Sequence, residues 1–469
     1  MIQRNLETVD NMYFIGAGGI GMSALVRYFL AKGKNVAGYD RTSSTITERL
    51  TKEGAPVHYD DDMTLIPAEF LDKNTTAVVY TPAVNDNHSE LTYFRDNGFE
   101  ILKRAEVLGL ITQSARGICV AGTHGKTTTS SMTAHILKQS HVDCNAFLGG
   151  ILKNYDSNLM LSDKTDLTVI EADEYDRSFH RLTPYISIIT SADPDHLDVY
   201  GTPEAYRQSF EHYTSLIRPG GALVMKKGVD IKPHLQKEVQ LYTYSATDKT
   251  ANFYAENIRV GVGEILFDLV FKDHNQEIIR DIQLGVPVRI NIENAVAAMA
   301  VARLCGVEAN EMKAAMASFG GAERRFDFKV KTDKAVYIDD YAHHPEELRN
   351  AILSVKELYK GQKVTGIFQP HLYTRTRDFA DDFAQALSLL DTLILLPIYP
   401  AREEPIEGIT SEMLLEKVNL KDKTLCEKDK LLEQIKTQNP SIIMTLGAGD
   451  IDRFVPLITQ LINEQDITI

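Results

Sequence analysis

The sequence lacks the features that mark membrane-spanning, secreted and nucleic-acid-binding proteins. No apolar run approaches the ~20 residues that cross a bilayer, and the N-terminus, MIQRNLE, has no apolar signal-peptide core. Lysine and arginine number 50 against 65 aspartates and glutamates, which gives a net charge of -15, and no dense basic run is present. Because a phosphate backbone demands basic surface, we expect no nucleic-acid partner. The missing signal peptide and membrane span predict a cytoplasmic protein with no membrane partner.

Cysteine is scarce. The four cysteines (Cys119, Cys144, Cys305 and Cys426) lie far apart and form no Cys-x-x-Cys pair. We therefore expect small core residues in a reducing compartment. The sequence has no internal repeat, heptad pattern or low-complexity segment, and its 43% hydrophobic and 25% charged residues are typical of a globular protein.

Short apolar runs alternate with helical patterns along most of the chain. Met12–Ile15 and Ala77–Tyr80 are examples from residues 10–105, and the same alternation resumes after a glycine-containing linker, Ser318–Ala322. Such alternation predicts parallel sheets flanked by helices, whereas the polar-apolar pattern of residues 251–290 predicts an antiparallel excursion. We predict an α/β chain with three domains, residues 1–107, 108–320 and 321–469.

One glycine-rich stretch, Gly122–Thr129 (GTHGKTTT), follows an apolar run and precedes a helical pattern. This arrangement is typical of a phosphate-binding loop, because glycines let backbone N–H groups approach a phosphate and a helix N-terminus favours anions. Lys126 would add a positive charge, and Thr127 would offer a hydroxyl to magnesium. The loop is shorter than the usual form, so a glycine turn that caps an ordinary helix is the alternative.

A second glycine turn, Gly16-x-Gly18-x-x-Gly21, also follows an expected strand and opens a helix. Asp40 stands nineteen positions after Gly21, where a ribose-binding acid belongs. Taken alone, the turn suggests a nicotinamide or flavin dehydrogenase. The phosphate loop a hundred residues later favours two separate diphosphate sites, one per domain. A purely structural tight turn is the remaining interpretation.

Two acidic segments follow apolar runs that we expect to be neighbouring strands. They are Glu171–Asp176 (EADEYD) and Asp193–Asp198 (DPDHLD). Ligand sites of doubly wound sheets lie at such strand ends, and carboxylates there can hold a magnesium that bridges nucleotide phosphates. His196 could serve as a metal or phosphate ligand. The competing interpretation is a pair of solvated acidic loops.

The C-terminal third carries three further polar segments. Arg324 and Arg325 lie just past the linker, where they could reach a nucleotide. Asp339–Pro345 (DDYAHHP) ends an expected strand, but adjacent histidines without a compact ligand set make a poor zinc site. In Gln369–Arg377 (QPHLYTRTR), Arg375 or Arg377 could hold a carboxylate in bidentate fashion. Each could equally be an ordinary polar surface segment.

Together these motifs resemble the Mur ligases, the amide-forming enzymes of bacterial cell-wall synthesis. The resemblance covers nearly the whole chain, and the order and spacing of its motifs make it specific. The matching segments are FIGAGGIGMSAL (14–25), RAEVLGLI (104–111), AGTHGKTTTSSM (121–132), EADEYDRSF (171–179), DPDHLDVY (193–200), GAERRFDF (321–328), DDYAHHPEEL (339–348), FQPHLYTRTRDF (368–379) and LGAGDI (446–451).

The resemblance implies a Rossmann-like domain for a UDP-linked substrate, a central P-loop ATPase-like domain and a Rossmann-like C-terminal ligase domain. It implies catalytic roles for Lys126, Glu171 and His196, and a metal site of Thr127, Glu171 and His196. The implied UDP-substrate residues are Gly16, Gly18, Gly19, Ile20, Gly21, Asp40, Thr81 and Arg104. The implied ATP-binding residues are Gly122, Thr123, His124, Gly125, Lys126, Thr127, Thr128, Asn291, Asn294, Arg325 and Asp340. Tyr341, His343 and Arg375 would bind the amino acid.

The implied reaction uses ATP and Mg²⁺. ATP phosphorylates the lactyl carboxylate of UDP-N-acetylmuramate, and the amine of L-alanine attacks the acyl phosphate. Because the first step brings anions together, the site must be electropositive. The implied partners are these small molecules, and the protein would act as a monomer or a homodimer.

Three departures from the family pattern bear on specificity. Ile290 stands where a histidine is usual, and Leu372 stands where alanine-adding members often have arginine. Residues 208–211 (QSFE) lack the lysine that other branches modify, which fits the alanine-adding branch. The alternatives are a ligase of the same family that recycles a preformed peptide, a nicotinamide-dependent oxidoreductase, and a binding module that holds ATP without turnover.

Overall fold

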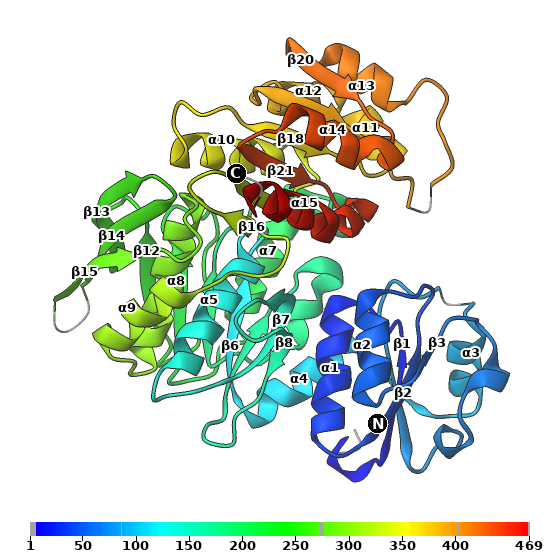
Figure 1. The fold of residues 1–469 in the computed structure, drawn as a ribbon. Coiled ribbons are helices and arrows are strands. Elements are labelled where there is room, and N and C mark those ends of the chain that lie inside the picture. The colour runs from blue at the N-terminus through cyan, green and yellow to red at the C-terminus, as the bar shows by residue number, and fades with distance from the viewer. Residues whose placement is uncertain (1–5, 86, 273–275, 402, 468–469) are drawn as a thin grey trace. The chain divides into compact units, whose positions relative to one another are not determined.

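The computed structural model describes residues 6–85, 87–272, 276–401 and 403–467, which form three sheets with flanking helices (Figure 1). The first sheet has the strand order β3-β2-β1-β4-β5, and all its pairings are parallel. Its elements are β1 (Asn11–Ile15), α1 (Ile20–Ala31), β2 (Asn35–Tyr39), α2 (Thr45–Glu53), β3 (Val57–His58), β4 (Thr76–Tyr80), α3 (Ser89–Asp96), β5 (Glu100–Lys103) and α4 (Arg104–Ser114).

Both faces of this first sheet are covered. Successive side chains of a strand point to opposite faces. Met12 and Phe14 of β1 belong to one apolar cluster with Leu25 of α1, whereas Tyr13 belongs to another with Phe94 of α3. All five residues of β1 are buried. The continuous apolar run in the sequence therefore reflects burial on two sides, as parallel sheets require.

The second sheet has ten strands in the order β15-β14-β13-β12-β11-β10-β6-β9-β7-β8. Strands β6, β9 and β10 pair in parallel with β6 between the other two, while β7 and β8 are antiparallel. The three strands within residues 251–290 are consecutive neighbours in this order. The strands are β6 (Arg116–Ala121), β7 (Asn145–Leu152), β8 (Ser157–Met160), β9 (Leu167–Glu171), β10 (Ile186–Ile189), β11 (Ala222–Lys226), β12 (Gln240–Ser245), β13 (Phe253–Gly261), β14 (Glu264–Phe271) and β15 (Glu277–Gln283). The accompanying helices are α5 (Lys126–Gln139), α6 (Leu197–Tyr200), α7 (Pro203–Thr214), α8 (Ile290–Leu304) and α9 (Ala309–Ser318).

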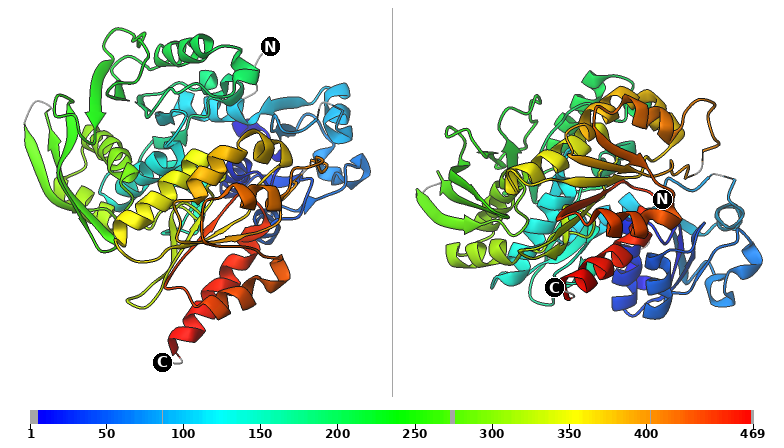
Figure 2. Two further views of the ribbon diagram at one scale, coloured as in Figure 1. Left: turned by 90° about the horizontal axis from the view of Figure 1, so that it is seen from above. Right: turned by 45° about the horizontal axis from the view of Figure 1, so that its top comes forward.

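The third sheet has the order β16-β17-β21-β18-β19-β20, and only the β16–β17 pair is antiparallel. Helices lie on both faces of this sheet (Figure 2). Its elements are β16 (Asp327–Lys331), β17 (Val336–Asp340), α10 (Pro345–Leu358), β18 (Thr365–Phe368), α11 (Tyr373–Asp378), α12 (Ala380–Leu387), β19 (Thr392–Leu395), α13 (Ser411–Lys417), β20 (Asp422–Leu425), α14 (Leu431–Gln438), β21 (Ile442–Leu446) and α15 (Val455–Ile467).

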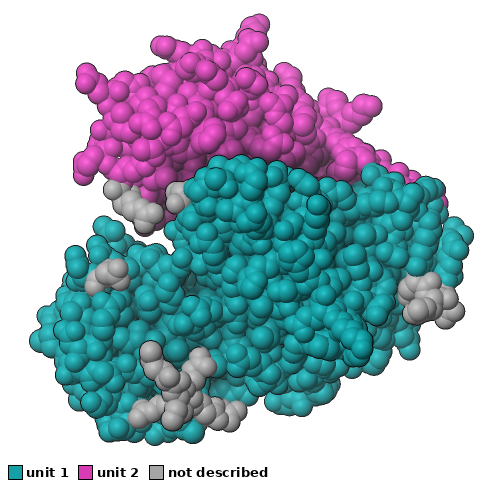
Figure 3. All heavy atoms as spheres, turned by 180° about the vertical axis from the view of Figure 1, so that it is seen from behind, with its two compact units in different colours: residues 1–256, 268–282, 292–319 teal, residues 257–267, 283–291, 320–469 magenta. Residues whose placement is uncertain are grey.

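The described residues cluster into two compact units, coloured separately in Figure 3. The first consists of residues 1–256, 268–282 and 292–319, and the second of 257–267, 283–291 and 320–469. The first unit contains the whole of the first sheet and most of the second. The boundaries expected at residues 107 and 320 stay a prediction.

All four cysteines are free thiols, and three of them are buried. Burial raises the pKa of the Cys119 thiol to about 12, so this group stays protonated and acts as a small core residue. Within the described ranges, no helix is long and apolar enough to cross a membrane.

A buried carboxyl group makes the stability of the first unit depend on pH. Glu90 of α3 is fully buried, and it accepts a hydrogen bond of 2.9 Å from the Tyr13 hydroxyl. Burial raises the pKa of Glu90 from 4.5 to about 8. Its neighbour His58, 3.1 Å from the Glu90 carboxylate, has a pKa lowered by burial and is neutral above pH 7. Between pH 7 and 8 the folded chain therefore keeps a proton on Glu90 that the unfolded chain has lost.

We expect the free energy of unfolding to fall by about 1 kcal/mol per pH unit in this window, relative to a Glu90→Gln variant that cannot ionise. The difference in Tm between the two proteins, measured by calorimetry at pH 7 and pH 8, reports the effect. Equal shifts in both proteins would mean that Glu90 is ionised in the fold.

Candidate active site

The candidate residues gather because the motifs follow adjacent parallel strands. The phosphate loop follows β6, the acidic segment Glu171–Asp176 begins at the end of β9, and Asp193–Asp198 lies beyond β10. These three strands are neighbours with β6 in the middle. Their carboxyl ends share one edge of the sheet, which is where α/β folds bind ligands.

Two glycines of the phosphate loop are required by its shape. Gly122 has φ +144°, and a Cβ there would lie 2.0 Å from the Thr190 hydroxyl oxygen. Gly125 is the left-handed N-cap of α5, with φ +80°. The His124 N–H donates to the Ser191 hydroxyl at 2.9 Å, and the Thr123 hydroxyl donates to the Asp193 carbonyl at 2.7 Å. The segment beyond β10 thus holds the loop at the start of α5, with Thr128 in the first turn of the helix.

Lys126 is the first residue of α5 and turns back over the loop. Its Nζ donates to the carbonyls of Gly122 (2.6 Å) and Thr123 (3.3 Å). The same Nζ lies 2.8 and 3.0 Å from the two carboxylate oxygens of Glu174. Glu174 is 2% exposed, and burial raises its pKa although Lys126 favours its charged form. The sequence motif contained Glu174, but its pairing with the loop lysine was not predicted.

Thr127 and Glu171 form the core of the expected metal site. The Thr127 hydroxyl donates to Glu171 Oε1 at 3.1 Å. Glu171 also fits closely against Gly149 of β7, where a Cβ would lie 2.2 Å from its Oε2. Hydroxyl and carboxylate oxygens are hard ligands suited to Mg²⁺, which usually takes few protein ligands beside substrate phosphates and water. These two residues fit that pattern.

The third expected ligand, His196, lies near Glu174. It is the left-handed N-cap of α6, and its Nε2 lies 3.9 Å from Glu174 Oε1. Its ring also packs edge-on against Tyr175, with centroids 5.1 Å apart. Over the described ranges, no group of three or more His, Cys, Asp or Glu side chains is arranged to hold a metal.

The two asparagines expected near adenine stand one turn apart on α8. The Asn294 side-chain oxygen accepts a hydrogen bond from Thr129 of α5 at 3.1 Å, and it would lie 2.9 Å from a Cβ on Gly125. Asn294 therefore supports the end of the phosphate loop. The Asn291 amide donates to the Val286 carbonyl, and Ile290 before it is 56% exposed.

The N-terminal glycine turn is closed by the residues expected to bind the UDP substrate. The Gly18 N–H donates to Asp40 Oδ2 at 2.7 Å, and a Cβ on Gly16 would lie 2.5 Å from Thr81 Cγ2. Gly19 caps α1, and Ile20 is the first residue of that helix. Asp40 and Thr81 arrive here because β2 and β4 flank β1.

Arg104 joins the glycine turn to the acidic segment. A Cβ on Gly21 would lie 2.1 Å from Arg104 Nη1, so the guanidinium occupies the space that glycine leaves open. Arg104 Nη2 donates to Asp173 Oδ2 at 2.9 Å. The N-terminal glycine turn thus contacts Glu171–Asp176 through Arg104, and the phosphate loop contacts it through Lys126.

The paired arginines of the second unit take different roles. Arg324 donates to the buried carboxylate of Asp339 at 3.0 Å and to the Gly447 carbonyl at 2.6 Å, which is a structural arrangement. Arg325 makes no side-chain hydrogen bond or ion pair with any residue the structure describes, and its guanidinium lies 5.7 Å from the centre of the Tyr341 ring. Asp340 accepts from the N–H groups of Phe326 and Ala342, both at 2.7 Å, and burial raises its pKa to about 6.

The expected amino-acid residues form one cluster in the second unit. Tyr341 and His343 follow β17, and their rings lie 5.2 Å apart. Arg375 of α11 approaches His371 at 3.4 Å, and the His371 ring lies 6.3 Å from that of His343. Burial lowers the pKa of His343, and the positive charge of Arg375 lowers it further. His371 is a member of this cluster that the sequence did not single out.

The structure distinguishes Arg375 from Arg377. Arg377 is exposed and pairs with its neighbour Asp378 at 2.7 Å, whereas Arg375 is partly buried beside His371. Leu372, just before α11, has φ +72°, an uncommon conformation for a bulky residue. Its N–H donates to the Tyr399 carbonyl at 2.9 Å.

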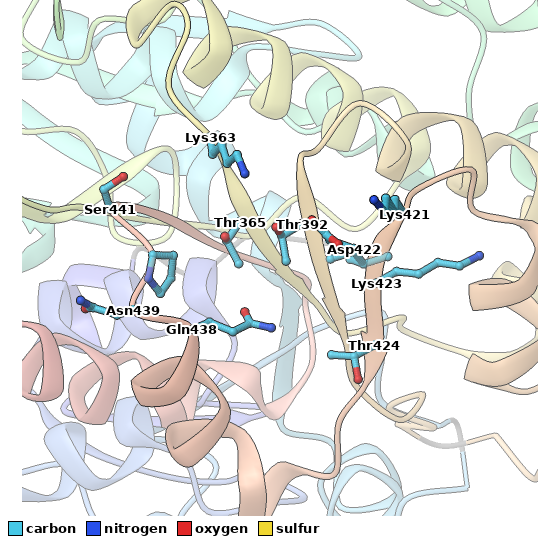
Figure 4. A pocket seen from close by; sticks show the side chains of 12 residues that line it. Lys363, Thr365, Thr392, Lys421, Asp422, Lys423, Thr424, Gln438, Asn439 and Ser441 are labelled. Carbon is cyan, nitrogen blue, oxygen red and sulfur yellow. The ribbon is translucent and has the colours of Figure 1, made fainter.

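A cavity of about 590 Å³ lies elsewhere in the second unit (Figure 4). Its lining includes Thr365, Thr392 and Asp422, which are the first residues of β18, β19 and β20. The Tyr341–His343–Arg375 cluster follows the opposite, carboxyl ends of the strands. Because ligands of parallel sheets bind at the carboxyl ends, this cavity is not the candidate site.

Comparison with known proteins gives matches along most of the chain. Residues 11–116 match the model of the Mur ligase family catalytic domain, residues 120–302 the Mur ligase middle domain, and residues 324–449 the Mur ligase glutamate ligase domain. A UDP-N-acetylmuramate–L-alanine ligase of Parabacteroides distasonis is 63% identical over 98% of this chain and 99% of its own length. A protein of the same name from Flavobacterium johnsoniae is 46% identical, over 98% of this chain and 99% of its own length. The crystal structure of UDP-N-acetylmuramate–alanine ligase from Thermotoga maritima superposes with a TM-score of 0.80 at 26% identity, covering 98% of this chain and 99% of that one.

Proposed function

The chain belongs to the Mur ligase family, and from this premise we propose that it is an ATP-dependent ligase that joins L-alanine to the lactyl carboxylate of UDP-N-acetylmuramate in peptidoglycan precursor synthesis. The observation that carries the proposal is the 63% identity, over 98% of the chain, to a protein named for this reaction. The two glycine loops held by one acidic segment support it, because the reaction brings two phosphate-bearing substrates together.

In the proposed reaction a carboxylate oxygen of the lactyl group attacks the γ-phosphorus of ATP, the bond to the β–γ bridging oxygen breaks, and ADP leaves. The amine of L-alanine then attacks the acyl carbon, loses a proton and displaces phosphate. Lys126 holds the transferred phosphoryl group, and the glycine N–H groups of residues 122–125 cradle the neighbouring phosphates. The required positive charge is supplied locally in a chain that is acidic overall.

We propose that Mg²⁺ binds at Thr127 and Glu171, with His196 at the edge of the site. When bound, the ion offsets phosphate charge and orients the triphosphate. Asp40, Thr81, Arg104 and the Gly16–Gly21 turn bind the UDP portion of the substrate. The ATP residues of the second unit are Asn291, Arg325 and Asp340, and those of the amino-acid site are Tyr341, His343 and Arg375. We infer a cytoplasmic monomer or homodimer that needs no nucleic-acid or membrane partner.

The direct test measures phosphate release from ATP with UDP-N-acetylmuramate and a panel of amino acids. We expect release with L-alanine that requires both substrates. Turnover with a preformed tripeptide in place of L-alanine would favour the recycling ligase, and binding of NADH would favour the oxidoreductase. ATP binding without turnover under any of these conditions would leave only a binding module.

The acyl-phosphate step makes a separate prediction. When the lactyl carboxylate carries ¹⁸O, one labelled oxygen should leave with the phosphate, because the bond between the acyl carbon and that oxygen breaks in the second step. Mass spectrometry of the released phosphate measures the transfer. Unlabelled phosphate formed during normal turnover would exclude the intermediate, even if the ligase activity itself is confirmed.

A further inference from the structure

Three carboxylates of one short stretch pair with cations of the phosphate loop and of the junction between β5 and α4. They lie in the acidic segment, Glu171–Asp176, whose residues beyond β9 lead into the 3₁₀ helix Tyr175–Arg181. The three carboxylates are those of Asp173, Glu174 and Asp176. Their partners are Arg104 at 2.9 Å, Lys126 at 2.8 Å and Lys103 at 3.1 Å, in that order.

At the phosphate loop, a carboxylate of the acidic segment forms an ion pair with the cation that a nucleotide phosphate requires. Both carboxylate oxygens of Glu174 lie within 3.0 Å of Lys126 Nζ, and the side chain is 2% exposed. Lys126 also donates to two loop carbonyls, so its donors are used within the protein. A phosphate that bound this ammonium would have to compete with a buried carboxylate for it.

At the N-terminal glycine turn, Asp173 likewise forms an ion pair with a cation, Arg104. Asp173 holds the Arg104 guanidinium, which lies against the backbone of Gly21 at the beginning of α1. That helix start is where the anion of a sugar nucleotide is expected to bind. Asp173 and Arg104 are 37% and 23% exposed, so their pair is open to competition by a ligand.

The two pairs are mechanically linked through the backbone. Asp173 and Glu174 are adjacent, and the Tyr175 N–H donates to Asp173 Oδ1 at 3.1 Å. After Tyr175, Asp176 and Arg177 have φ values of 52° and 53°. Two consecutive non-glycine residues in the left-handed region are strained, and such strain persists only where surrounding contacts impose it. Release of either carboxylate would remove some of these contacts.

We propose that the acidic segment couples the two anion-binding loops. In the free protein it serves as an internal anion for Lys126 and Arg104 together. A nucleoside triphosphate at the first loop displaces Glu174, loosens the segment and weakens the hold of Asp173 on Arg104, so the sugar nucleotide binds more tightly. Linkage requires the reverse effect to be equal. The inference rests on the proposed function, since it takes ATP and UDP-N-acetylmuramate as the two ligands.

Binding without turnover tests the coupling, with Asp173 and Glu174 treated as positioning residues. Titration calorimetry gives the Kd of a non-hydrolysable ATP analogue with and without saturating UDP-N-acetylmuramate, in the absence of amino acid. We expect the sugar nucleotide to tighten the analogue by about 5-fold or more. In Asp173→Asn the ratio of the two Kd values should fall toward one, while the sugar nucleotide alone binds more tightly than it does to the unmodified chain.

Asp166→Asn is the matched control. Asp166 immediately precedes β9, pairs with Arg116 at 2.6 Å and is half exposed, so the variant loses the same charge at the opposite end of the strand. It should keep the full ratio. A loss of folded protein lowers the number of sites but leaves the ratio unchanged, which separates coupling from stability.

The outcomes separate the coupling from the proposed function. Binding of both ligands to the unmodified chain with independent affinities would overturn the coupling and leave the proposed function intact. An unchanged ratio in Asp173→Asn would remove the acidic segment from the coupling. Failure of the unmodified chain to bind either ligand would overturn the proposed function, and the coupling with it.

Discussion

Lys126→Ala is expected to lower kcat for phosphate release by about 10³-fold or more, equivalent to about 4 kcal/mol of transition-state stabilisation. The reason is local. Lys126 Nζ stands over the phosphate loop, 2.6 Å from the Gly122 carbonyl, so it is placed to meet the phosphoryl group as its charge shifts between donor and acceptor oxygens. Stopped assays of phosphate release with both substrates and ATP at saturation measure the loss.

The same substitution leaves the buried Glu174 carboxylate without its ammonium partner, so stability must be followed as well. The double variant Lys126→Ala/Glu174→Gln removes that uncompensated charge. We expect it to recover Tm without recovering turnover. Lys164→Ala, at an exposed position before β9, removes the same charge and should behave as the unmodified chain. A well-folded double variant with near-normal kcat would show that Lys126 is not the phosphoryl ligand.

Arg375→Ala is expected to raise KM for L-alanine by about 10²-fold, because a charge-assisted, bidentate contact to a carboxylate is worth about 1.5–3 kcal/mol. Arg375 is the arginine of its motif that faces His371 and acts electrostatically on His343. If it contacts only the amino acid, KM for ATP should change little. Initial rates at varied L-alanine, with the other substrates saturating, give the constant.

Arg377→Ala provides the matched control within the same helix. It removes an identical side chain, but one that is exposed and paired with Asp378. KM for L-alanine should stay within about 2-fold of the normal value, since surface ion pairs contribute little. Equal effects of the two substitutions would mean that the helix is sensitive as a whole, and an unchanged KM in Arg375→Ala would place the amino-acid carboxylate elsewhere.

Much of this molecule could be predicted from its sequence. The α/β class was correct, because the apolar runs of β1, β4, β6 and β18 are buried on two faces and leave a continuous signal in the sequence. The positions of the glycine loops were correct for a similar reason. A residue such as Gly122, with φ +144° and no room for a Cβ, is dictated by its own backbone and by immediate neighbours.

Other features could not be read from the sequence. Strand β3 has only two residues, too few for a periodic pattern, and the antiparallel β7–β8 and β16–β17 pairs depend on partners rather than on local composition. The adjacent arginines Arg324 and Arg325 looked equivalent, and both guanidinium groups lie over the Tyr341 ring, yet of the two it is Arg324 that binds the buried Asp339. Adjacent residues point in different directions, and only the surrounding fold decides which of them is enclosed.

The sequence by itself determined the fold class, the two glycine loops, the identity of the loop lysine and the family. These depend on residues close together along the chain and on backbone conformations that few side chains allow. The tertiary structure decided which carboxylate meets which cation: Glu174 with Lys126, and Asp173 with Arg104. Those pairings depend on the tertiary arrangement, which brings Arg104, just beyond β5, and Lys126, beyond β6, within reach of the acidic segment although both are far from it in sequence. Electrostatic attraction acts through space and falls with distance, so no pattern along the chain could have specified it.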